Sequence, residues 1–237
     1  KRLMKFGVPA GISFFVEIFA FTLFLFMVGQ LGKMELAATN ITFAINMLAF
    51  LPMICFSIGT STLVGQAIGR GRPEDGVVAT NSALHICFCY MASIALIYLL
   101  FPEWLFTLFK PDNSLGADYA QLVQMGRVLL LFVAAYSLFD TGNIIFAAAI
   151  KGAGDTRFVT WTIASMSTGL MVIPVYVSIK YFDGGLYLAW SFITAYVCLI
   201  SFIFWWRFKQ GKWKSMRVIE SRPVIILENP GVPTTEI

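Results

Sequence analysis

Residues 6–31 read FGVPAGISFFVEIFAFTLFLFMVGQL, and Glu17 is the only charged residue in this stretch. A helix that crosses a bilayer needs roughly 20 mostly apolar residues. A charged side chain at the centre of such a helix costs roughly 2.5–3.5 kcal/mol on insertion scales, and buried acids in membranes usually mark a functional site. The stretch therefore predicts a transmembrane helix that carries a functional acid.

Five further stretches are similarly long and apolar. With the first, they predict six transmembrane helices over residues 4–30, 36–69, 77–101, 117–150, 157–179 and 186–208. Hydrophobic residues make up 58% of the chain and charged residues 13%, against about 45–50% and about 25% in soluble domains. We expect an all-α integral membrane bundle over residues 1–215 and a flexible cytoplasmic tail over 216–237.

Two prolines and one short segment are exceptions to the pattern of six regular spanning helices. Pro52 and Pro174 lie inside apolar stretches and are expected to kink their helices. Residues 103–110 are too short to span and carry a charge at each end, so a helix lying in the membrane interface is expected there.

Connections rich in basic residues alternate along the chain with connections that hold few of them. The N-terminus, the turns at 69–76 and 151–157 and the C-terminal segment are rich in Lys and Arg, whereas the other connections hold only Lys33, Lys110 and Lys180. Because such residues concentrate on the cytoplasmic side, both ends are expected in the cytoplasm, in a multi-pass protein of the cytoplasmic (inner) membrane. The net charge of +4 then reflects topology, and no nucleic-acid partner is expected.

A second acid, Asp140, lies inside the fourth apolar stretch. Glu17 follows Lys5 by 12 residues and Asp140 precedes Lys151 by 11, so both acids are expected about 16–18 Å from the same surface. Tyr136 lies one turn from Asp140 on the same helix face. Two facing carboxylates in a low dielectric cannot both stay ionised, so they take up a proton or hold a cation. The sequence therefore predicts a cation site, with a hard cation or a proton as occupant and no other metal or cofactor.

Aromatic and amide side chains near this depth are candidates for lining a substrate site. Phe21 and Phe24 are able to hold an aromatic cation by cation–π contact. The alternative is that these rings pack against other helices or lipid. Asn40, Asn46 and Asn143 add polar groups on the second and fourth helices.

Several motifs occur in the order found in the multidrug and toxic compound extrusion (MATE) transporters. They are Pro9-Ala-Gly11 ahead of Glu17, Gly29-Gln-Leu-Gly32 with Leu36-Ala-Ala38, Val64-Gly-Gln-Ala-Ile-Gly-Arg-Gly71, and Lys151-Gly-Ala-Gly-Asp-Thr156. Over roughly residues 1–215 the chain resembles the C-terminal six-helix lobe of that family. The resemblance implies half of a twelve-helix, two-lobe antiporter that exports lipophilic or cationic organic compounds such as drugs in exchange for Na⁺ or H⁺. It also implies that Glu17, Asp140 and Tyr136 occupy the coupling positions of the sodium-dependent branch.

The resemblance implies partners as well. One lobe has a single polar cavity face, so an N-terminal six-helix lobe or a second copy of the chain is expected to close it. Membrane lipid and a small organic substrate are the other expected partners.

Three other interpretations make different predictions. A lipid-linked saccharide flippase of the same superfamily needs a buried basic cluster for pyrophosphate. A non-transporting membrane scaffold predicts that Glu17→Gln is harmless or stabilising. An intramembrane protease using Asp140 and Asp155 is disfavoured, because Asp155 lies in a short basic turn, where it is expected to cap the next helix. We therefore expect no enzymatic activity.

Overall fold

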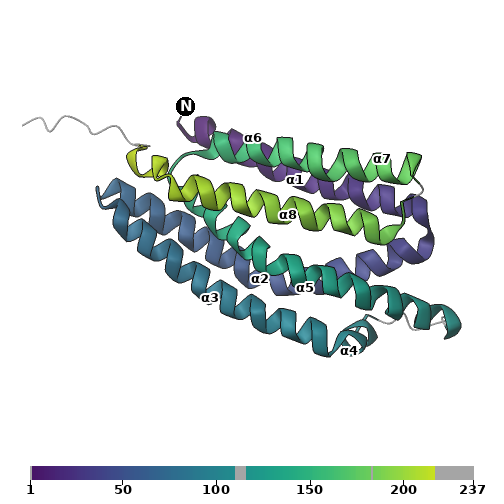
Figure 1. The fold of residues 1–237 in the computed structure, drawn as a ribbon. Coiled ribbons are helices and arrows are strands. Elements are labelled where there is room, and N and C mark those ends of the chain that lie inside the picture. Colours follow the sequence, from purple (N-terminus) through teal and green to yellow (C-terminus); the bar gives the residue numbers. More distant parts are fainter. Residues whose placement is uncertain (1, 110–115, 183, 217–237) are drawn as a thin grey trace, which may run out of the picture.

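The computed structural model describes residues 2–109, 116–182 and 184–216, which form a bundle of long helices (Figure 1). Six helical stretches of this described part are long and apolar enough to cross a membrane: Gly7–Leu31, Lys33–Gly69, Pro73–Leu100, Tyr119–Gly152, Thr156–Tyr181 and Leu186–Lys209. The predicted all-α class and six spans are confirmed, whereas the orientation in the membrane stays a prediction. Apart from its first residue, the predicted tail over 216–237 lies outside the described residues.

The elements follow the predicted order, with small shifts at their ends. They are α1 (Arg2–Leu31), α2 (Lys33–Gly69), α3 (Pro73–Leu100), α4 (Pro102–Thr107), α5 (Gly116–Gly152), α6 (Thr156–Met166), the π-helix η1 (Ser167–Val172), α7 (Ile173–Tyr181), α8 (Leu186–Lys209) and the 3₁₀-helix η2 (Lys212–Ser215). Helices α2 and α5 each have 37 residues, or about 55 Å. Because a bilayer core is about 30 Å thick, these helices must tilt or extend beyond it.

Helix α5 is the centre of the bundle, since it packs against α2, α3 and α8. Helix α1 packs mainly against α6, η1 and α2. Figure 1 shows α1, α6 and α7 along one side and α2 and α3 along the other, with α5 and α8 between them. The core is continuous across these groups and contains Phe24, Trp190 and Phe204, all fully buried. Glu17 therefore lies on a helix at one side of the bundle and Asp140 on a helix in its middle.

Small residues allow α2 and α5 to approach closely. A Cβ atom added at Gly152 of α5 would overlap the backbone of Ser61 on α2, and one added at Gly65 would meet the Gly152 carbonyl oxygen at 3.2 Å. Such close backbone approach is how helices associate in a lipid environment, where apolar surface alone gives little driving force.

The fifth span is a composite of α6, η1 and α7 rather than one α-helix over 157–179. Pro174 is the second residue of α7, which directly follows the π-helix. Proline lacks the N–H that would bond the carbonyl one turn earlier, and π-helical turns are one way in which a helix absorbs that loss. Helix α2, in contrast, continues through Pro52.

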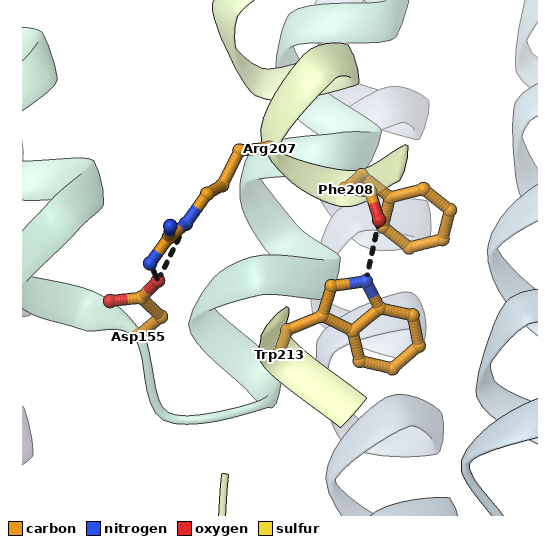
Figure 2. Close-up of polar contacts among 4 residues, drawn as sticks. All are labelled: Asp155, Arg207, Phe208 and Trp213. Atoms are coloured by element: carbon orange, nitrogen blue, oxygen red, sulfur yellow. Dashed lines mark hydrogen bonds and ion pairs between the residues drawn. The ribbon is translucent and has the colours of Figure 1, made fainter. Parts of the chain in front are cut away.

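One end of the bundle is held together by polar contacts that the sequence did not predict (Figure 2). Asp155 precedes α6 but makes no capping hydrogen bond, so the predicted cap is wrong. Its Oδ2 instead accepts hydrogen bonds from Nε and Nη2 of Arg207 at 3.0 and 2.6 Å. Next to this pair, the indole Nε1 of Trp213 donates to the carbonyl oxygen of Phe208 at 2.9 Å.

Candidate functional site

Asp140 is the buried centre of the candidate site. It lies on α5, its side chain is 9% exposed, and its Oδ1 accepts a hydrogen bond from Nδ2 of Asn143 at 2.7 Å. The two residues are three positions apart, so one face of α5 presents both. Asn143, predicted to line a substrate site, is therefore a direct partner of the acid.

Glu17 approaches Asp140 from α1. Its side chain is half-buried, and the charges of the two carboxyl groups act on each other through space. Among the described residues Glu17 forms no ion pair within 4.0 Å, but it interacts electrostatically with Lys151. The two acids thus lie on different helices within range of each other's charge, and their pairing in one site stays a prediction.

Lys151 was predicted to mark the membrane surface, but its charge reaches the acid site. It lies in the last turn of α5, eleven residues after Asp140, which places both residues on nearly the same face of the helix. Side chains on a helix point back toward its N-terminus, so this half-buried lysine extends toward the depth of Glu17. The eleven-residue spacing was the signal that could have indicated this role.

Two tyrosines complete the surroundings of the acids. Tyr136, 4% exposed, lies one turn before Asp140, and its hydroxyl accepts a hydrogen bond from Nδ2 of Asn46 on α2 at 3.4 Å. Tyr196 on α8 is equally buried and interacts electrostatically with both Glu17 and Asp140. Sequence reasoning missed Tyr196, because no local pattern distinguishes it from the other aromatic residues of α8.

The residues predicted to line a substrate site do not share one environment. Phe24 is fully buried against Phe43 and Trp190, at ring-centroid distances of 6.2 and 6.3 Å, so it is a core residue and has no free face for a ligand. Phe21 is half-buried, with its ring 5.9 Å from that of Phe43. Asn40 is exposed on α2. Phe21 and Asn40 remain candidates, whereas the structure does not support Phe24.

A cation held between Glu17 and Asp140 must draw on uncharged oxygen atoms for its remaining ligands. Within residues 2–109, 116–182 and 184–216, no group of three or more His, Cys, Asp or Glu side chains is suited to hold a metal ion. Ser137 and Thr141 flank Asp140, but their hydroxyls donate to carbonyl oxygens of their own helix. Their oxygens still have lone pairs to offer, as hard cations such as Na⁺ require.

Comparison with known proteins gives a consistent family match. The profile of the MatE family matches residues 9–177. A relative described as "Probable multidrug resistance protein NorM" from Thermotoga maritima is 24% identical over 220 residues, which are 92% of this chain and 46% of that protein. The chain thus spans about half the length of the curated relatives it matches.

Solved structures match over the same extent. An outward-facing multidrug resistance MATE family transporter of the MOP superfamily superposes with a TM-score of 0.78 at 19% identity, covering 90% of this chain and 47% of that one. A MOP superfamily transporter from Pyrococcus furiosus gives 0.69 at 19% identity, with coverages of 89% and 45%. These matches show that this chain has the fold of about one half of such a protein.

Proposed function

Because the chain belongs to the MATE family of membrane transporters, which are not enzymes, we propose that it is one lobe of a cation-coupled exporter of lipophilic or cationic organic compounds. In this proposal Glu17 and Asp140 bind the coupling cation, Na⁺ or H⁺, and Tyr136 supports Asp140. The other candidate functions have no specific observation in their favour.

The observation that supports the proposal is the presence of two acids on different helices of an apolar bundle, each within range of the other's charge. Glu17 comes from α1 and Asp140 from α5, and their charges act on each other. Burying either charge costs free energy that a purely structural role would not recover. A cation removes the repulsion and part of the desolvation cost, in competition with Lys151, whose charge also acts on Glu17.

Coupling follows from the positions of the two helices. Helix α1 packs with α6, η1 and α2, whereas α5 packs with α2, α3 and α8. A cation that joins Glu17 to Asp140 therefore favours the arrangement in which α1 and α5 approach each other. Release of substrate is linked to ion occupancy if the two arrangements differ in their affinity for substrate.

Export itself needs more than this lobe. The matched proteins are about twice as long, and a second six-helix lobe, N-terminal or a second copy, would close the substrate path. Both acids lie on the present chain, so cation binding is expected even without the second lobe.

The test measures cation binding directly. The chain is placed in lipid nanodiscs, and tryptophan fluorescence and the emission of a fluorescent lipophilic cation are followed while Na⁺ or pH is varied. We expect a saturable response to Na⁺ or H⁺ that Asp140→Asn and Glu17→Gln remove. Glu103→Gln, an exposed acid on α4, is the matched control and should respond as the wild type does. An Asp140→Asn protein that responds normally would refute the proposal and favour a scaffold.

A further inference from the structure

Beside the acid site, two polar groups are buried without a partner. Within the described part of the chain, neither Oδ1 of Asn46 nor the hydroxyl of Tyr98 has a hydrogen-bonding partner. Asn46 on α2 is 9% exposed and Tyr98 on α3 is 3% exposed. Leaving a buried polar group unpaired destabilises the folded state, so each such group calls for a physical explanation.

The two groups converge on Tyr136. The Asn46 amide donates to the Tyr136 hydroxyl at 3.4 Å, and Tyr98 belongs to the same buried core cluster as Tyr136. Their helices α2, α3 and α5 all pack against one another. The three buried polar side chains therefore come from three helices that pack together, and Tyr136 lies a single turn of α5 away from Asp140.

The hydrogen-bonding inventory of these groups shows what fits between them. The Tyr136 hydroxyl already accepts from Asn46, and none of the described residues accepts its hydrogen. Oδ1 of Asn46 needs a donor, while the Tyr98 hydroxyl can donate or accept. A water molecule satisfies all three at once, and about three hydrogen bonds are typical of a buried water. Na⁺ fits less well, because these three oxygens carry no charge to offset its dehydration, whereas Asp140 does.

We infer that Asn46, Tyr98 and Tyr136 form an internal water site, and that the bound water fixes the direction of the Tyr136 hydroxyl beside Asp140. Asn46 and Tyr98 are then positioning residues of the cation site. The existence of the water site stands on the geometry alone, whereas its effect on cation binding rests on the proposed function.

Hydroxyl-radical labelling tests the water directly. Radicals are generated in ¹⁸O water around the full chain in nanodiscs, and labelled side chains are located by mass spectrometry. A buried tyrosine reacts only where water touches it, so we expect Tyr98 to be labelled well above the fully buried Phe106, after correction for intrinsic reactivity. Asn46→Leu should reduce that labelling severalfold. Labelling of Tyr98 no greater than that of Phe106 would overturn the inference.

Cation binding tests the positioning role. Residues that orient the ligands of a metal ion typically change its affinity by about 10–100-fold, so Tyr98→Phe and Asn46→Leu should weaken the apparent affinity for the coupling cation by about tenfold. Tyr98→Phe removes only one hydroxyl and keeps the test valid if Asn46→Leu fails to fold. Tyr187→Phe and Asn81→Leu, at exposed positions, are the matched controls.

The outcomes separate the two claims. A wild type without any cation response refutes the proposed function, while labelling of Tyr98 still decides the water site. The positioning role alone would be refuted by a different set of results. In that case the wild type responds to the cation, Asp140→Asn does not, and Tyr98→Phe binds the cation with unchanged affinity.

Discussion

Asp155 and Arg207 are 52 residues apart in the chain, yet two guanidinium nitrogens of Arg207 donate to a single carboxylate oxygen of Asp155. The side chains are 11% and 17% exposed, and the guanidinium also lies 4.5 Å from the centre of the Phe158 ring. The pair joins the turn after α5 to the end of α8, as Figure 2 shows. It therefore holds three helices in place at one end of the bundle.

Arg207→Leu should destabilise the protein strongly. Removing one partner of a buried ion pair leaves the other charge unpaired, which costs about 3–5 kcal/mol. Thermal unfolding in detergent, followed by tryptophan fluorescence, measures the effect. Arg72→Gln is the matched control, because its pair with Asp75 is 73% and 48% exposed and should contribute at most about 1 kcal/mol. Equal losses of thermal stability in the two variants would show that the buried ion pair contributes no more to the fold than the exposed one.

Trp213 should contribute strongly to the stability of the fold, although it lies beyond the last span. It is fully buried, stacks on Phe208 at 5.0 Å and lies against Gly76 at the start of α3. We expect Trp213→Ala to cost about 3–5 kcal/mol, and Trp213→Phe clearly less, since the ring contact remains while the hydrogen bond is lost. The same unfolding assay checks both. A Trp213→Ala protein as stable as the wild type would mean that η2 is not part of the folded lobe.

The sequence predicted the spans well because the membrane sets a length and a polarity that each helix must satisfy on its own. Contacts between distant segments have no such local signal. Asp155 was expected to cap α6, but Arg207 reaches it once α8 has packed. Phe24 was expected at a substrate surface, but packing against Trp190 encloses it. The shared depth of Glu17 and Asp140 was predictable because depth follows from the helical rise, and their pairing in one site stays a prediction, whereas the place of Tyr196 depended on how α8 is rotated.

Gly152→Ala should separate α2 from α5. Its Cβ would overlap the backbone of Ser61, which cannot move as a flexible side chain could. Overpacking of this kind costs about 1–3 kcal/mol, so the unfolding temperature should fall. Gly59→Ala on α2, where no atom lies within 4 Å of the added Cβ, should be neutral or raise stability by up to about 1 kcal/mol. Similar effects at the two positions would argue against a close crossing.

Lys151→Met should strengthen cation binding at the acid site. In the proposed function the Lys151 charge acts on Glu17 and competes with Na⁺ for the same carboxylate. Losing a charge interaction of about 1 kcal/mol corresponds to about a fivefold gain in apparent affinity, measured by Na⁺ titration of tryptophan fluorescence in nanodiscs. Lys209→Met is the matched control, since Lys209 lies at the end of α8 with its amine 4.6 Å from the centre of the Trp205 ring and should leave the affinity unchanged. If Lys151→Met instead lowers the affinity for Na⁺, the lysine helps to form the site rather than competing with the cation. The two roles predict opposite changes in Na⁺ affinity.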